Sequence, residues 1–306
     1  MTSGTSVAAG GGGTRSHPRP TRLYILIGLM QLFWSANFLV GKIALREFPA
    51  LLVAGLRVLI AGACVLPLCW WKDRGQARWT KRDLPLLALL AFIGVSVNQF
   101  FFIVGLSKTS VAHSALIIGM TPISVLLIAT LRRLEKITLR KIGGMLAALL
   151  GVAVLSIEKS NGAGPSLAGD LITLVAGSAF ALYTVLGKEV NQRFGSLTMN
   201  TFLFGFGALF LLPVVVWQAG SFSFGQVSPS GWLALIYMGV FPSLVCYLIF
   251  YYALGYVAAS RLSTLAYLQP LVATLLGVIF LGERISVPLV TGGAIIFAGV
   301  YLTERG

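Results

Sequence analysis

The sequence predicts an all-α integral membrane protein with ten transmembrane helices, built from two inverted five-helix repeats. Three observations support this prediction: the apolar composition, a series of apolar runs long enough to span a bilayer, and an internal repeat. Of the 306 residues, 57% are hydrophobic and 10% are charged, and the mean hydropathy is +0.89. Soluble domains are about 25% charged, so this chain has too little polar surface to form one.

The net charge of +14 does not indicate a nucleic-acid-binding protein. Most Lys and Arg residues lie in short gaps between apolar runs, as is typical of membrane proteins, and no soluble basic face remains for nucleic acid. The three cysteines, Cys64, Cys69 and Cys246, have no disulfide or metal-ligand spacing. We therefore expect no metal site, no cofactor and no nucleic-acid partner.

Residues 1–22 contain a glycine run and three arginines, which predicts a disordered cytoplasmic tail. Ten apolar runs follow, each close to the ~20 residues that a helix needs to cross a bilayer. They are too long for barrel strands and lack the alternation of such strands. The predicted spans are 23–45, 49–71, 84–105, 109–131, 138–157, 168–188, 197–217, 231–253, 258–281 and 286–303.

The orientation follows from the positions of the basic residues. If both termini are cytoplasmic, 17 of the 23 Lys and Arg residues lie inside and 5 lie outside, while Arg57 falls within a span. Because cytoplasmic loops are enriched in Lys and Arg, this distribution predicts a multi-pass protein of the cytoplasmic membrane with both termini inside.

The two halves of the chain, 23–157 and 168–303, repeat one another. At offsets of 146 and 148 residues, the matched positions are Gly41 and Gly187, Lys42 and Lys188, Pro67 and Pro213, Trp71 and Trp217, Pro122 and Pro270, Glu135 and Glu283, Gly144 and Gly292, and Gly151 and Gly299. Each half contains five spans, so the second half starts on the opposite side of the membrane and is inverted relative to the first.

Inverted repeats recur in secondary transporters, where the two halves enclose a site near the midplane and exchange two related states. The architecture therefore predicts a secondary transporter that works by alternating access. The alternative is a non-transporting structural or lipid-handling membrane protein that arose by the same duplication.

Several motifs resemble the drug/metabolite transporter superfamily, and in particular its ten-helix exporters of the EamA type. They are Phe33–Phe38 in span 1, Leu56 and Arg57 in span 2, Pro122 and Pro270, and the Gly-Glu-Arg-Ile-Ser turn at 282–286. The resemblance covers about residues 23–303, with Lys136 in place of the usual Arg in the first Glu-Arg turn. It implies a basket of ten helices, a substrate path lined by spans 1–4 and 6–9, peripheral spans 5 and 10, and export of small metabolites such as amino acids.

Carboxylates are absent from the interior of the predicted spans, because all nine acidic residues lie at span ends or in gaps. Coupling through a buried carboxylate is therefore disfavoured. Arg57 is the one strong cation within a span, and it lies about 12 Å from the outer end at 1.5 Å per residue. It is a candidate anchor for an anionic substrate group; the alternative is that it snorkels to the outer interface, toward Glu47.

Polar and aromatic residues within the spans are candidates for a substrate pocket near the midplane. We select Trp34, Asn37, Asn98, Tyr183 and Tyr267, with Arg57, as substrate-binding residues. The alternative for the neutral residues is hydrogen bonding between helices or a position at the membrane interface. Further polar residues of the same kind are Ser35, Gln99, Thr184, Tyr247, Tyr251 and Gln269.

Four residues are candidates for gating or hinge roles. His113 and Arg261 occupy matching positions near the starts of spans 4 and 9, where they either line opposite entrances or lie at helix ends as ordinary interfacial residues. Pro122 and Pro270 are expected to bend the same two spans, either as hinges or as static kinks.

Two further features of the sequence indicate structural roles. Thr138 and Ser286, which follow the Glu135 and Glu283 turns, are predicted N-caps. A stripe of small residues on span 5, Gly143, Ala147 and Gly151, predicts close helix packing, either within the chain or between two copies in a homodimer.

No motif of an enzyme is present. The sequence has no His-Glu-x-x-His, Gly-x-Ser-x-Gly or P-loop motif, and its histidines are His17 and His113. The sequence thus predicts a secondary transporter and no enzyme: an exporter of small metabolites whose partners are a small-molecule substrate and the lipid bilayer.

Overall fold

The computed structural model describes residues 20–72, 79–132, 138–155, 165–256, 262 and 268–305. Every regular element within these ranges is a helix, as predicted. Seven stretches are long and apolar enough to cross a bilayer, and two shorter apolar helices cover Leu268–Leu281 and Val287–Thr303. The chain is therefore an all-helical, multi-pass membrane protein.

The first repeat follows predicted spans 1 to 5 in order. Its elements are α1 (Pro20–Glu47), α2 (Ala50–Lys72), the 3₁₀ turn η1 (Lys81–Asp83), α3 (Leu84–Ala91), the π-helical segment η2 (Phe92–Val97), α4 (Asn98–Lys108), α5 (Val111–Ile118), α6 (Thr121–Leu131) and α7 (Leu139–Leu155). α3, η2 and α4 together form the third span, and α5 and α6 form the fourth.

The second repeat has the same order of elements. They are α8 (Leu167–Phe194), α9 (Ser196–Ala219), the 3₁₀ turn η3 (Phe224–Gln226), α10 (Pro229–Met238), the π-helical segment η4 (Gly239–Val245), α11 (Cys246–Leu254), α13 (Leu268–Leu281) and α14 (Val287–Arg305). The first part of the predicted ninth span, except Leu262, lies outside the described residues.

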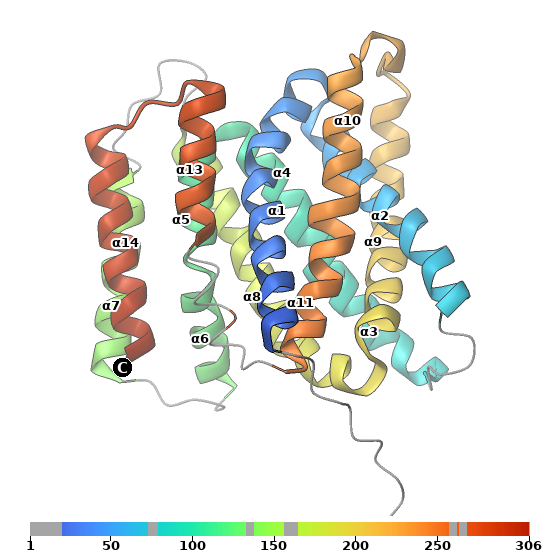
Figure 1. Ribbon diagram of the computed structural model, residues 1–306, viewed down its shortest axis with the longest axis horizontal. Coiled ribbons are helices and arrows are strands. Elements are labelled where there is room, and N and C mark those ends of the chain that lie inside the picture. Colours follow the sequence, from blue (N-terminus) through green and yellow to red (C-terminus); the bar gives the residue numbers. More distant parts are fainter. Residues whose placement is uncertain are drawn as a thin grey trace, which may run out of the picture.

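The two repeats run in opposite directions through the bundle. α1 begins and α14 ends at the same end, which is the lower end in Figure 1. α6 ends and α7 begins at this lower end, whereas the matching helices α13 and α14 meet at the upper end. Equivalent turns thus lie on opposite faces, which confirms the predicted inversion.

Contacts between the repeats are also paired by this pseudo-twofold symmetry. α2 packs on α9, and α7 packs on α14, so each of these pairs joins equivalent helices. α1 packs on α10, α11 and α13, and its equivalent α8 packs on α4, α5 and α6. The first helix of each repeat therefore lies against the third and fourth spans of the other.

The π-helical segments lie at matching places in the third and eighth spans. Shifting η2 by the repeat offset of 148 residues places it on η4. A π-helical turn inserts one residue into an α-helix and is frequent at functional sites. Asn98 follows η2 directly, and Tyr247 lies in the first turn of α11 after η4.

The fourth span is broken at Gly119 and Met120, and Pro122 lies in the first turn of α6. Proline has no amide hydrogen and is well tolerated there, so the predicted bend is a break between two helices. Pro270 lies in the first turn of α13. A Cβ atom on Gly119 would lie 3.1 Å from Cγ of Pro270, so the fourth and ninth spans approach closely at these prolines.

Both predicted N-caps are observed. Thr138 Oγ1 accepts a hydrogen bond from Lys141 N at 3.2 Å, and Ser286 Oγ accepts one from Leu289 N at 3.1 Å. Each hydroxyl satisfies a backbone donor at the start of a helix, so these residues stabilise the beginnings of α7 and α14.

Glu283 has a second role, which the sequence did not reveal. Its carboxylate accepts hydrogen bonds from Val111 N at 2.7 Å and Ala112 N at 3.1 Å. A residue of the second repeat thereby caps α5 of the first repeat, where an anion also interacts favourably with the helix dipole. The matching residue Glu135 lies outside the described residues.

Glycines allow α7 and α14 to pack closely at the edge of the bundle. A Cβ atom on Gly144 would lie 2.5 Å from Gly299 O, and one on Gly151 would lie 2.7 Å from Gly292 O. A Cβ atom on Gly143 would meet nothing within 4 Å. The predicted stripe is therefore wrong by one residue at Gly143 and at Ala147, because the face that packs runs through Gly144, Ala148 and Gly151. Gly144 and Gly151 pack within the chain.

Candidate functional site

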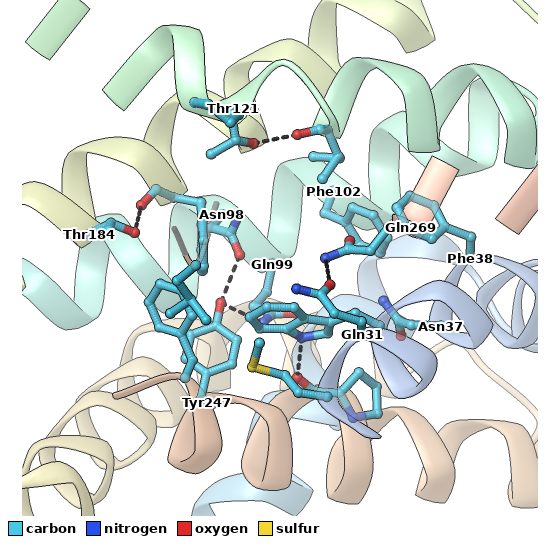
Figure 2. Close-up of a pocket in the computed structure, with 18 of the residues that line it drawn as sticks. Gln31, Asn37, Phe38, Asn98, Gln99, Phe102, Thr121, Thr184, Tyr247 and Gln269 are labelled. Atoms are coloured by element: carbon cyan, nitrogen blue, oxygen red, sulfur yellow. Dashed lines mark hydrogen bonds between the residues drawn. The ribbon is translucent and has the colours of Figure 1, made fainter. Parts of the chain in front are cut away.

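A cavity with about 990 Å³ of empty space, including the space open at its mouth, lies between helices of both repeats (Figure 2). One face of α1 contributes Met30, Gln31, Trp34, Asn37 and Phe38, which recur at helical spacing. The remaining described lining residues are Arg57, Asn98, Gln99, Phe102, Ile118, Thr121, Pro122, Val125, Phe180, Thr184, Pro242, Tyr247, Phe250, Leu254, Leu262 and Gln269.

These residues come from spans 1–4, 6, 8 and 9. The resemblance also implied a contribution from span 7, but α9 supplies none of the described lining residues. It packs instead against α2, α3, η2 and α11, behind the wall of the cavity. α7 and α14 contribute nothing to the described lining either, in agreement with the expected peripheral position of spans 5 and 10.

Arg57 is buried at the wall of this cavity, with 1% of its surface exposed. Its Nε donates a hydrogen bond to Ser243 Oγ at 3.1 Å, and its Cζ lies 5.9 Å from the centre of the Phe102 ring. Its Nη1 is buried and has no hydrogen-bond partner among the described residues. The guanidinium is therefore only partly satisfied by the protein.

The snorkelling alternative for Arg57 is wrong, because a side chain with this burial does not reach the interface. Glu47, the suggested partner, accepts hydrogen bonds from Ser228 N at 3.0 Å and from Ser228 Oγ at 2.6 Å. It thus holds the residue that precedes α10. No described carboxylate pairs with Arg57.

Trp34 forms the aromatic side of the cavity. Its Nε1 donates to Pro242 O in η4 at 3.0 Å, which ties α1 to the π-helical segment of the other repeat. Its ring lies perpendicular to the rings of Phe180 and Tyr247, with centroids 5.9 and 6.2 Å away, and the Phe250 ring lies at 5.7 Å. This wall is suited to the apolar part of a ligand.

Asn98 belongs to a buried hydrogen-bond network with Gln99 and Tyr247 (Figure 2). Asn98 Nδ2 donates to Ala176 O at 2.9 Å, and the Tyr247 hydroxyl donates to Asn98 Oδ1 at 3.0 Å. Gln99 Nε2 donates to the same hydroxyl at 3.1 Å. The network joins α4, α8 and α11. Asn98 therefore forms hydrogen bonds between helices, as the alternative interpretation proposed, and it also lines the cavity.

Gln31 and Gln269 form an amide pair across the cavity wall. Gln269 Nε2 donates to Gln31 Oε1 at 2.5 Å, so the pair links α1 to α13 (Figure 2). Gln31 was missed in the sequence, although it precedes Trp34 by three residues and lies on the same face of α1. The smaller residues Gly177 and Thr121 stand at the equivalent positions of the other half.

Asn37 lines the cavity as predicted, and its Oδ1 is buried without a hydrogen-bond partner among the described residues. A buried polar atom of this kind usually has a partner. The free acceptor is therefore a candidate contact for a hydroxyl or amide group of a ligand.

Tyr183 does not line the cavity, in contrast to the prediction. It is fully buried behind the wall, with its ring 6.1 Å from Tyr247 and 5.3 Å from Tyr251. Phe180 and Thr184, which are four residues apart on α8, face the cavity instead. The reason is the helical period, which points Tyr183 toward Gly94 in η2.

His113 lies away from the cavity, near the start of α5. Its Nδ1 lies 3.2 Å from Asp170 Oδ2, and Thr109 Oγ1 donates to Asp170 Oδ1 at 2.5 Å. Asp170 is in the first turn of α8 and is 1% exposed. The sequence placed this acid correctly at a span end but did not reveal that it is buried against His113.

The remaining predicted residues have different positions. Pro122 lines the cavity, whereas Pro270 is buried beside Gly119 and is absent from the described lining. Arg261 and Tyr267 lie outside the described residues.

Comparison with known proteins agrees with this architecture. The chain matches the EamA-like transporter family twice, over residues 21–157 and 167–305. It is 28% identical over 286 residues to an uncharacterized transporter of Archaeoglobus fulgidus, covering 92% of this chain and 97% of that protein. It is 25% identical over 283 residues to the uncharacterized transporter YetK of Bacillus subtilis, covering 92% of this chain and 86% of that protein.

A protein of known crystal structure has the same fold, with a TM-score of 0.65, 20% sequence identity, and coverage of 93% of this chain and 96% of that one. Both halves of the chain thus match one family, and the chain aligns nearly end to end with the Archaeoglobus fulgidus transporter. The protein is a membrane transporter that belongs to the EamA-like transporter family.

Proposed function

We propose that this transporter is a secondary carrier that exports small metabolites bearing a carboxylate, of which amino acids are the simplest examples. The observation that carries the proposal is the cavity between the inverted repeats, at which the Nη1 of Arg57 has no hydrogen-bond partner among the described residues. Guanidinium groups bind carboxylates with good geometry. The surrounding aromatic residues suit an amphipathic organic body.

Alternating access is supported by the symmetry of the fold. The two repeats are inverted and make equivalent contacts, so exchanging their conformations would close the cavity on one side and open it on the other. The break before Pro122 and the first turn of α13 at Pro270 are proposed hinges. His113 and Arg261 are proposed gate residues at opposite ends of the bundle, Arg261 on the basis of its sequence position alone.

The described lining residues extend closer to the end of the bundle where the termini lie than to the opposite end. This difference supports entry of the substrate from the side of the termini. At that end the lining reaches Leu254, the last residue of α11. Toward the opposite end it stops at Phe102 and Arg57, within α4 and α2. With both termini in the cytoplasm, this is the cytoplasmic side, from which an exporter takes its cargo.

The proposed orientation in the cytoplasmic membrane is testable by cysteine labelling. In a chain with Cys64, Cys69 and Cys246 replaced by alanine, we expect Arg132→Cys to react with an impermeant maleimide only in inverted vesicles. Arg284→Cys should react only in intact cells, because the two exposed positions lie at opposite ends of the bundle. The reverse pattern would place the termini outside.

Transport itself is tested by counterflow. Purified protein in liposomes preloaded with a pool of amino acids and organic acids should take up at least one labelled member of the pool faster than empty liposomes do. If no solute exchanges above that background, the alternative of a structural or lipid-handling membrane protein would be favoured instead.

A further inference from the structure

The charge balance of the cavity points to the charge of its cargo. Arg57 is the one charged side chain among the described lining residues. The polar groups beside it are amides and hydroxyls, and most of the wall is apolar or aromatic. The described part of the site thus carries one positive charge and no negative charge.

Four described carboxylates at the ends of spans have partners other than Arg57. Glu47 binds Ser228, Glu283 caps α5, Asp170 contacts His113, and Asp83 pairs with Arg193 at 2.8 Å. None of them compensates Arg57. A buried charge without a counter-charge is unfavourable, so the empty site is improved by any ligand that supplies one negative charge.

We propose that the cavity selects net monoanions, organic acids with an apolar body, over zwitterions and cations of the same carbon skeleton. This inference rests on the proposed function and names the substrate class of that site. A monoanion neutralises the site when its carboxylate meets Arg57. A zwitterion brings an ammonium as well, which leaves the site with its positive charge and a second desolvated ion.

The ammonium of a zwitterion would find few favourable partners. The lining offers aromatic rings and the free Oδ1 of Asn37, but no described carboxylate. The ring of Trp34 packs perpendicular to the rings of Phe180 and Tyr247, and these contacts occupy part of the aromatic surface. A ring face attracts a cation weakly compared with the cost of burying that cation. The same rings are well suited to an uncharged hydrocarbon group.

The test uses matched triads of solutes, each an oxo acid, the amino acid and the amine of one side chain. An example is 4-methyl-2-oxopentanoate, leucine and 3-methylbutylamine, with corresponding aromatic and polar triads. In counterflow into proteoliposomes, we expect the oxo acids to exchange at least about tenfold faster than the amino acids. The amines should not exchange above the background of empty liposomes.

The outcomes separate this inference from the proposed function. Equal or faster exchange of the amino acids or the amines would overturn the monoanion selectivity while leaving transport intact. Absence of exchange for every solute would instead contradict the proposed function. Thermal shift of the purified protein with each triad gives a second readout, because at equal concentration a ligand that binds the folded state more tightly stabilises it more.

Arg57→Gln tests the source of the selectivity, since it removes the charge and keeps a hydrogen-bonding group at a similar position. We expect the ratio of the affinity for the oxo acid to the affinity for the amino acid, measured by thermal shift, to fall toward one. A variant that remains monodisperse and keeps the wild-type ratio would overturn the inference. Arg46→Gln removes an exposed cation from the same end of the bundle and should leave the ratio unchanged.

Discussion

Replacing Arg57 with leucine is expected to lower counterflow of carboxylate solutes by about 10- to 100-fold, because a hydrogen bond to a charged group contributes about 1.5–3 kcal/mol. The fold should tolerate the change, since the equivalent residue of the other repeat is the fully buried Leu203. Removal of a buried cation that no described carboxylate compensates should leave the midpoint of thermal unfolding unchanged or raise it.

This combination of effects distinguishes binding from folding. A structural role of Arg57 would lower the unfolding midpoint together with transport, whereas a role in binding lowers transport alone. Arg46→Leu is the matched control, because Arg46 is exposed and does not line the cavity. If the Arg57→Leu variant showed counterflow at the wild-type rate, the proposed role of Arg57 in binding would be contradicted.

Replacing Gly144 with leucine is expected to destabilise the protein by about 1–3 kcal/mol, and more if the helix pair separates. A Cβ atom at this position would lie 2.3 Å from Thr303 Oγ1 and 2.5 Å from Gly299 O. The second of these contacts is with backbone, which cannot rotate away, so α7 would be pushed off α14. The midpoint of thermal unfolding in detergent measures the effect.

The adjacent glycine provides the control. Gly143→Leu adds the same side chain one residue earlier, where a Cβ atom would meet nothing within 4 Å. Its unfolding midpoint should stay within the small range that is usual for surface substitutions. Leucine has a higher helix propensity than glycine, so propensity alone would not destabilise either variant. Equal destabilisation by both variants would therefore contradict the close contact of α7 with α14 as the cause of the loss.

Much of the fold was predictable because a bilayer imposes strict requirements on a chain. Each span needs about 20 apolar residues, and every backbone group must be satisfied within the span. The helices were therefore visible in hydropathy alone. The repeat was visible because glycines, prolines and the Glu-Arg turn recur in one order, and an odd number of spans per repeat makes inversion unavoidable.

The binding residues were predictable only in part. Arg57, Trp34, Asn37 and Asn98 were selected because polar groups are costly in a span, and the structure brings them to one cavity. Tyr183 was selected by the same argument but packs behind the wall. The free-energy cost of a polar group within a span shows that the group needs a partner. It does not say whether that partner is a ligand or another helix.

The π-helical segments η2 and η4 were not predicted from the sequence. Each π-helical turn adds a residue, which rotates all later side chains relative to a regular helix. The directions of the side chains after η2 and η4, including Asn98, Gln99 and Tyr247, therefore depend on this added residue.

Composition, hydropathy and the repeat were thus sufficient to identify ten spans in two inverted halves, because these properties depend on the chain and the bilayer alone. Packing between the halves was needed to show that Gln31 meets Gln269, that Asp170 is buried beside His113, and that Arg57 lies at a cavity without a described counter-charge. These contacts join residues far apart in the chain, and their geometry depends on how each helix is rotated about its axis against its neighbours.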